Sequence, residues 1–341
     1  MPIFASLPER ITRVLHPPED LDENDLAGAL TREWGVAVAA MKYEPLGFGS
    51  HHWSVVDQTG TSWFTTVDDL QRKRRSARDT FDAAYLRLRC ALDAACRLHD
   101  AGATFVVAPL ITAGDEPVAR FRPRYAVTMY PLIVGDSFGF TQYDGEAHRH
   151  AVLQMILRVH SAPPSVRERA AHDDLVVPHR DALEAVLDGA VVADCGPYAR
   201  GVARVLTEHA VPIRDLLARY DELAARVDQR RAVLTHGETH PGNTMRTPGG
   251  WRLIDWDTAL VAQPERDLWM LGADVQRAYE EATGVTLRPE LLQMYRLRWD
   301  IADLAVDADR FCHPHTGTPD DIESWSILQR VLATIAVGDL P

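Results

Sequence analysis

The sequence predicts an α+β protein of two lobes, in which a five-stranded antiparallel sheet with one helix precedes a mainly helical part. Short segments separated by turn residues, typical of strands, predominate before residue 130. Mostly helical patterns follow that point, and the segment Tyr130-Pro131-Leu132 is expected to connect the two parts. We therefore expect an N-terminal lobe at 1–130 and a C-terminal lobe at 131–341.

The N-terminal lobe is expected to begin with a helix over residues 21–34. Leu26, Leu30 and Trp34 recur at helical spacing there, and Gly35 is a suitable stop. Five strands and one long helix follow in the prediction, with strands at 37–45, 52–56, 62–67, 106–111 and 125–129 and the helix at 78–99.

The C-terminal lobe is expected to consist mainly of helices. They are predicted at 147–160, 178–189, 198–209 and 213–230, and again from 268 to the end of the sequence. The exception is an island of strands and turns at 232–260. This island holds the residues that carry the functional prediction.

Composition excludes some classes of partner. The formal net charge of −13 for 341 residues argues against nucleic acid or an anionic membrane surface and fits a cationic ligand better. No apolar run is long enough to cross a bilayer, and the first ten residues lack the pattern of a secretory signal. We expect a cytoplasmic protein.

The most informative stretch is HGETHPGN, from His236 to Asn243, followed by WRLIDWD, which ends at Asp257. Glycine and proline make the first part a loop, and the turn TPGG joins two short strands that would bring Asn243 and Asp255 together. Both side chains offer the hard oxygen ligands that a magnesium ion prefers. The carboxylate of Glu238, five positions before Asn243, could accept or orient the proton of an attacking hydroxyl.

Two other interpretations of this stretch are weaker. A plain surface loop would leave the joint spacing of the two parts unexplained. A zinc protease needs H-E-x-x-H on a helix, but Glu238 is one place late and Gly237 and Pro241 oppose a helix.

The two parts together resemble the HGDxHxxN and IDxD motifs of the aminoglycoside phosphotransferase and choline kinase group, relatives of the protein kinases. The resemblance implies a two-lobed protein kinase-like fold, and an enzyme that uses Mg²⁺ with ATP or GTP as phosphate donor. It also implies a catalytic role for Glu238 and metal binding by Asn243 and Asp255. His236 and His240 would brace the loop.

Other segments extend the resemblance. LGFGSHHW resembles the kinase glycine-rich hairpin, which implies nucleotide binding at Gly47, Gly49 and Ser50, although such a turn is often merely a turn. Tyr130 and Leu132 stand where the family's hinge binds the base, and a plain linker is about as good an interpretation.

Two further segments concern the catalytic loop. Residues 263–268 resemble the family segment in which an acid anchors the catalytic loop. The helix at 151–160 resembles the family helix that ends in Leu-His, and His160 is expected to pack or cap rather than catalyse.

The sequence departs from the family at two places. Glu238 stands where the family usually has aspartate, and Thr66 or a neighbour stands where the third strand normally carries a lysine that holds the α- and β-phosphates. The chain has only two lysines, Lys42 and Lys73. The basic run around Lys73 could reach the triphosphate, but a solvated helix start is the more ordinary interpretation.

These departures leave alternatives open. One is a nucleotide-binding pseudokinase or sensor, and another is a metabolic kinase of a sugar or amino alcohol. The favoured hypothesis is phosphorylation of a hydroxyl on a cationic antibiotic or natural product. The expected substrate-contacting residues are Asp257 near the metal, the acidic helix face with Asp300 and Asp303, and Trp299 as a stacking surface.

Overall fold

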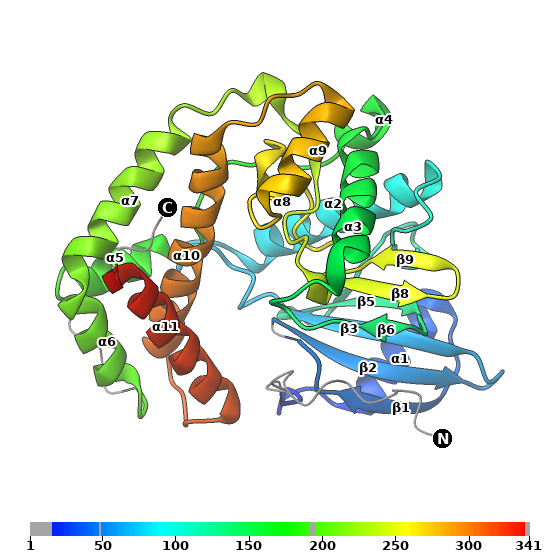
Figure 1. The fold of residues 1–341 in the computed structure, drawn as a ribbon. Coiled ribbons are helices and arrows are strands. Elements are labelled where there is room, and N and C mark those ends of the chain that lie inside the picture. Colours follow the sequence, from blue (N-terminus) through cyan, green and yellow to red (C-terminus); the bar gives the residue numbers. More distant parts are fainter. Residues whose placement is uncertain (1–15, 48, 191–194, 338–341) are drawn as a thin grey trace. The chain divides into compact units, whose positions relative to one another are not determined.

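A computed structural model describes residues 16–47, 49–190 and 195–337 (Figure 1). Phe48 of the predicted glycine-rich turn lies outside the described residues, as do the first ten residues discussed above. The chain divides into two compact units. Unit 1 comprises residues up to 73, 81–173 and 229–287, and unit 2 comprises 74–80, 174–228 and the residues from 288 onward. The predicted lobe boundary near residue 130 stays a prediction.

Unit 1 contains the predicted five-stranded sheet, and all neighbouring strands are antiparallel. The strand order is β1-β2-β3-β5-β4 within the described residues. The strands are β1 (Val38–Glu44), β2 (Ser50–Asp57), β3 (Ser62–Asp69), β4 (Ala119–Phe121) and β5 (Tyr125–Pro131). The predicted α+β class with an antiparallel sheet is thereby confirmed.

The predicted strand at 106–111 is wrong. The fourth strand of the sheet is the short segment β4, and residues 106–111 run as an extended segment with only an isolated bridge from Val106 to Leu253. Proline at position 109 has no N–H to donate to a strand ladder, so regular pairing is interrupted there. The sequence pattern identified a buried segment, but it did not identify the strand with which the segment would pair.

The two faces of the sheet differ in chemistry. Helix α1 (Glu23–Trp34) packs on an apolar face that includes Trp53 and Met129, both fully buried. Side chains alternate between faces along a strand. His52 of β2 lies opposite Thr66 of β3, so these two polar residues share the other face. This polar face is the one on which the site is built.

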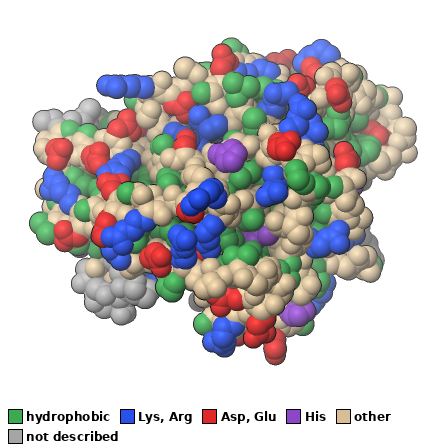
Figure 2. All heavy atoms as spheres, turned by 90° about the horizontal axis from the view of Figure 1, so that it is seen from above, with side chains coloured by type: hydrophobic (Ala, Val, Ile, Leu, Met, Phe, Trp, Pro, Cys, Tyr) green, Lys and Arg blue, Asp and Glu red, His purple; other side chains and the backbone are tan. Residues whose placement is uncertain are grey.

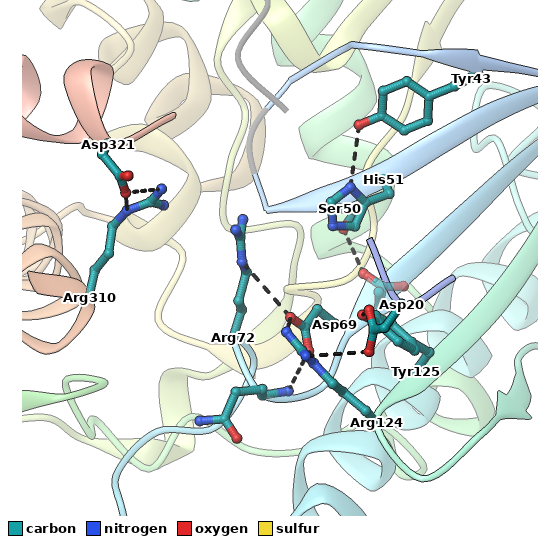
Figure 3. A network of polar contacts seen from close by, with 12 residues as sticks. Asp20, Tyr43, Ser50, His51, Asp69, Arg72, Arg124, Tyr125, Arg310 and Asp321 are labelled. Atoms are coloured by element: carbon teal, nitrogen blue, oxygen red, sulfur yellow. Dashed lines mark hydrogen bonds and ion pairs between the residues drawn. The ribbon is translucent and has the colours of Figure 1, made fainter. Parts of the chain in front are cut away.

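The last two residues of β3, Asp68 and Asp69, point to opposite faces of the sheet. Asp69 accepts hydrogen bonds from the guanidinium of Arg124 at 2.9 and 2.7 Å (Figure 3). Tyr125 donates to Asp20 at 2.6 Å in the same network. Asp68, the preceding residue, points to the opposite side of the strand. The Asp69 network therefore fixes the strand end that presents Asp68.

The remainder of unit 1 is helical, with short strands. Its helices are α2 (Phe81–Asp100), α3 (Gly145–His160), α4 (Pro164–Arg167), α8 (Glu265–Leu268) and α9 (Ala273–Thr283). Its short strands are β6 (Asp136–Ser137), β7 (Val233–Thr235), β8 (Thr244–Thr247), β9 (Gly250–Leu253) and β10 (Leu260–Ala262). Two 3₁₀ turns, η1 (Gln229–Arg231) and η2 (Pro241–Asn243), also belong to it. The β8–β9 hairpin confirms the turn predicted at TPGG.

Unit 2 is built of helices in the described residues. They are α5 (Arg180–Leu187), α6 (Ala199–Glu208), α7 (Ala210–Ala224), α10 (Pro289–Phe311) and α11 (Pro319–Val337). Each begins within a few residues of a predicted helix or falls in the predicted helical region. None of the helices that the structure describes combines the length and apolarity that crossing a membrane requires. On the face shown in Figure 2, acidic and basic side chains are interspersed.

Candidate active site

The loop from His236 to Asn243 is anchored by one buried carboxylate, that of Asp267. The backbone N–H groups of His236 and Gly237 donate to its two oxygens at 2.9 and 2.5 Å. The Nε2 atom of His160 lies 3.1 Å from the same carboxylate. Burial alone would raise the pKa of Asp267, but the hydrogen bond and charge of His160 outweigh it and lower the pKa. The anchoring role implied by the resemblance is confirmed by these contacts.

The backbone of the loop has little freedom. Gly237 has φ +99°, a region that favours glycine, and a Cβ atom there would overlap the guanidinium of Arg266. That guanidinium donates to the carbonyl of Thr258 at 2.9 Å. His236 is fully buried, and its Nε2 lies 2.9 Å from the carbonyl of Ile254, next to Asp255. His236 therefore ties the loop to the residue that precedes the predicted metal ligand.

The hairpin brings the predicted metal ligands together. The N–H of Ile254 donates to the carbonyl of Asn243 at 2.9 Å, which places Asn243 beside Asp255. The side-chain nitrogen of Asn243 donates to the carbonyl of Glu238 at 2.9 Å, so its amide oxygen is the atom that remains to bind a cation. Asp255 has φ +65°, an uncommon conformation for a residue other than glycine and one that recurs at functional sites.

Negative charge is concentrated at this point. Partial desolvation by the surrounding protein and the charges of Asp257 and Glu238 raise the pKa of Asp255 well above its ordinary value, although its side chain reaches solvent. Desolvation also acts on Asp257, but the ammonium of Lys73 outweighs it and lowers the pKa of Asp257. A cation bound beside Asp255 would relieve the crowding of carboxylates.

These donors fit a magnesium ion. An amide oxygen and a carboxylate are hard ligands, and magnesium in nucleotide sites takes one or two protein carboxylates and completes its shell with phosphate oxygens and water. Among the described residues, no group of three or more His, Cys, Asp or Glu side chains is arranged to hold a metal. Asn243 and Asp255 are the residues that would offer these two kinds of ligand.

Lys73 corrects one expectation from the sequence. The interpretation of the surrounding basic run as a solvated helix start is wrong, because residues 71–73 form a turn and the Lys73 side chain is only 20% exposed. Its Nζ atom lies 3.0 Å from Asp68 and 2.5 Å from Asp257. Sequence reasoning omitted both Lys73 and Asp68 from the candidate site. The scarcity of lysine in the chain was the available signal.

The residues predicted to bind nucleotide line the polar face of the sheet. Gly47 and Gly49 have φ +62° and +98°, which glycine adopts without strain. The Ser50 hydroxyl donates to Asp68 at 2.6 Å. The Thr66 hydroxyl lies 3.1 Å from Nδ1 of His52. Burial lowers the pKa of His52 to about 4, so this imidazole is neutral at physiological pH.

The predicted hinge residues follow at the end of β5. Tyr130 belongs to β5 and Leu132 comes directly after it, and both side chains are half-buried. Desolvation raises the pKa of the Tyr130 hydroxyl, and the carboxylates of Asp68 and Asp255 add to the effect. Tyr130 therefore lies near the carboxylates of the site. Its predicted contact with a base stays a prediction, as does that of Leu132.

Glu238 has two histidines as neighbours. Nε2 of His240 lies 3.8 Å from a carboxylate oxygen of Glu238, whose side chain is 31% exposed. The ring of His240 packs on Phe140, with 4.3 Å between the ring centroids. The N–H of Glu238 donates to Nδ1 of His236 at 3.2 Å. Asn243 donates to the carbonyl of Glu238, and the charge of Glu238 acts on Asp255, so the three residues lie in one region, while their predicted roles stay predictions.

The predicted substrate residues are divided between the two units. Asp257 lies in unit 1 with the metal pair and Lys73, whereas Trp299, Asp300 and Asp303 lie on α10 in unit 2. Burial raises the pKa of Asp300 above its ordinary value. Contact of these four residues with a substrate stays a prediction.

Asp307, a further acid on α10, has the most strongly raised pKa of the acids named on that helix. Asp307 is 5% exposed, and burial, reinforced by the charge of Asp303, raises its pKa to about 7. The opposing charge of Arg310 is too weak to restore an ordinary pKa. Asp307 is therefore an acid that is about half protonated near pH 7 in the folded protein.

Residues 55–306 match the phosphotransferase enzyme family (APH). The chain is similar to Protein StrN of Streptomyces griseus, with 30% identity over 310 residues, which are 86% of this chain and 86% of the relative.

The fold is similar to two solved kinases. A spectinomycin phosphotransferase in complex with ADP and spectinomycin has a TM-score of 0.70 and 17% identity, covering 95% of this chain and all of that one. An amicoumacin kinase in complex with AMP-PNP and Ca²⁺ has a TM-score of 0.56 and 13% identity, covering 92% and 93%. At these identities the likeness confirms the fold.

Replacing Asp267 by asparagine is expected to loosen the loop and destabilise unit 1. The amide has one acceptor oxygen for the N–H groups of His236 and Gly237, so a buried donor loses its partner. We expect the free energy of unfolding to fall by about 3 kcal/mol. Denaturation in urea measures this change.

The matched control is Asp274→Asn on α9. Asp274 is 59% exposed and lies 3.9 Å from Arg149, so its loss is expected to be nearly neutral. Equal unfolding free energies for the two variants would contradict the anchoring role of Asp267.

Replacing Asp307 by asparagine is expected to stabilise the protein at alkaline pH. The folded-state pKa of about 7 exceeds the ordinary value of 3.8, so wild-type stability falls between these two pH values as only the unfolded chain loses the proton. The variant avoids this loss, which amounts to at most about 4 kcal/mol.

Thermal unfolding at pH 4 and pH 8.5 tests this expectation, because the stability difference between variant and wild type should grow with pH. Asp215→Asn, at an exposed position on α7, is the control. A difference that is the same at both pH values would show that Asp307 is ionised normally in the folded protein.

Proposed function

The chain belongs to the phosphotransferase enzyme family, and on that premise we propose that it is a magnesium-dependent kinase of an amine-bearing antibiotic. As a member of the family it is an enzyme that transfers a phosphoryl group in the manner of a kinase. Magnesium dependence, ATP or GTP as donor, and a hydroxyl of an aminoglycoside or aminocyclitol as acceptor are the finer parts of the proposal.

One observation carries the proposal, namely the meeting of Glu238, Asn243 and Asp255 at the β8–β9 hairpin. The amide oxygen of Asn243 and the carboxylate of Asp255 would hold the magnesium ion. When bound, the ion neutralises charge on the phosphate oxygens and so favours the transfer. The backbone hydrogen bonds to Asp267 keep these side chains in a fixed arrangement before the nucleotide binds.

Glu238 then acts on the acceptor. Its carboxylate accepts the proton of the acceptor hydroxyl while the hydroxyl oxygen forms a bond to the γ-phosphorus. The bond from that phosphorus to the bridging oxygen breaks, and the nucleoside diphosphate leaves with the electron pair. His240, 3.8 Å from the carboxylate, orients Glu238. The products are a phosphorylated alcohol and a nucleoside diphosphate.

The choice of an amine-bearing acceptor has two supports. The acidic sequence, with net charge −13, favours a cationic small molecule over an anionic one. The solved kinase with the TM-score of 0.70 was crystallised with spectinomycin and ADP. Acidic side chains on α10, Asp300 and Asp303, are the residues we propose for the amines of the acceptor, and Trp299 offers a surface for a ring.

The decisive experiment measures transfer of labelled γ-phosphate from ATP or GTP to a panel of acceptors. The panel contains spectinomycin, aminoglycosides, a neutral sugar and an amino alcohol. Glu238→Ala is expected to lower kcat by roughly 10²- to 10⁴-fold, because the general base is lost. Glu238→Asp is expected to lose up to about 100-fold, because the carboxylate is withdrawn by about 1 Å.

The control is Glu281→Ala, an exposed position on α9, which should retain wild-type kcat. Chelation of magnesium should abolish transfer and its return should restore it. Transfer to the sugar or amino alcohol alone would refute the antibiotic acceptor. Nucleotide binding without transfer to any acceptor would favour a sensor.

A further inference from the structure

Backbone hydrogen bonds fix the position of Lys73 between the sheet and the hairpin. Its backbone N–H donates to the carbonyl of Asp69, at the end of β3, at 3.2 Å. Arg87 of α2 donates to the carbonyl of Lys73, also at 3.2 Å. The turn that carries Lys73 is therefore fastened on one side to the strand and on the other to the helix.

The side chain of Lys73 is paired on two sides. Its Nζ atom lies 3.0 Å from Asp68 of the sheet and 2.5 Å from Asp257, which follows Asp255 by two residues. Placing an ammonium group where only 20% of the side chain is exposed is costly unless it is paired with carboxylates. This arrangement holds a positive charge beside the predicted metal ligand.

Asp68 links the same charge to the glycine-rich turn. The Ser50 hydroxyl, directly after Gly49, donates to Asp68 at 2.6 Å. Asp68 and Thr66 are two residues apart on β3 and therefore point to the same face of the sheet. A polyphosphate that extends from the glycine-rich turn to Asp255 would pass Lys73.

The pairing differs in its parts from the one in protein kinases. There a lysine on the third strand pairs with a glutamate on the helix that follows. Here β3 offers the carboxylate Asp68, the turn offers the lysine, and the sequence of α2 contains no glutamate. In this chain the ion pair therefore joins a carboxylate of the third strand to a lysine in the turn that follows the strand.

We propose that Lys73 binds the α- and β-phosphates of the nucleotide and so replaces the lysine that is missing at Thr66. Asp68 and Asp257 align the ammonium, and a phosphate oxygen becomes its third partner when the nucleotide is present. This inference rests on the proposed function, because it requires that a nucleotide binds at this site. Thr66 then contributes a hydroxyl to the sheet face rather than the main phosphate contact.

The test compares ligands with and without phosphates. Calorimetry measures the Kd of adenosine, and of ATP with magnesium (or guanosine and GTP, if GTP is the donor). For Lys73→Met, we expect the Kd of the triphosphate to rise about 10- to 100-fold, as for the loss of a charged hydrogen bond. The Kd of the nucleoside should stay within about twofold of wild type, because it makes no phosphate contact.

Lys42→Met is the matched control. Lys42 is the other lysine of the chain, and its side chain is 73% exposed and pairs with Glu44 on β1. This variant should bind both ligands as wild type does. The nucleoside Kd also serves as a check on folding, because a misfolded site would lose affinity for both ligands.

A relocated lysine provides the second test. In the double variant Thr66→Lys with Lys73→Met, a lysine returns to the third strand on the same face as Asp68, and triphosphate affinity is expected to recover. Wild-type triphosphate affinity in Lys73→Met would overturn the inference and leave the proposed function standing. Failure of the wild-type protein to bind either triphosphate would instead overturn the proposed function.

Discussion

The ion pair between Lys73 and Asp257 is the contact on which the charge balance of the site depends. Asp68, Asp255, Asp257 and Glu238 all bring carboxylates to one region, and one ammonium group partly compensates them. The pKa of Asp257 is lowered because the charge of Lys73 outweighs its desolvation, whereas that of Asp255 is raised by desolvation and by the charges of Asp257 and Glu238, which outweigh the effect of Lys73. The site is therefore short of positive charge at the position where a metal ion would sit.

The second constraint is backbone geometry. The carboxylate of Asp267 accepts hydrogen bonds from the N–H groups of His236 and Gly237, and the side chain of Asn243 donates one to the carbonyl of Glu238. A loop pinned at both ends presents its side chains without first having to be ordered, so binding energy is not spent on arranging them. The left-handed backbone of Asp255 fits this arrangement, because the surrounding hydrogen bonds can support a conformation that a free chain would rarely adopt.

Sequence patterns predicted the parts of the site that are local. The residues of HGETHPGN and the TPGG turn are neighbours in the chain, so their spacing alone determines how loop and hairpin meet. Lys73 and Asp257 are 184 residues apart, and no local pattern reports such a contact. The strand predicted at 106–111 failed for a related reason, since an apolar run indicates burial but does not identify the neighbouring strand.

These constraints limit how the longer side chain of Glu238 can be accommodated. Its side chain is longer than that of aspartate by one methylene, which corresponds to about 1 Å, and a misplacement of that size costs roughly a hundredfold in rate. The loop cannot retract to compensate, because Asp267 holds one end and Asn243 holds the carbonyl of Glu238 itself. Under the proposed function, the acceptor hydroxyl would therefore be bound farther from the loop backbone than an aspartate at position 238 would require. His240, within 4 Å of the Glu238 carboxylate, is positioned to steady the longer side chain in that place.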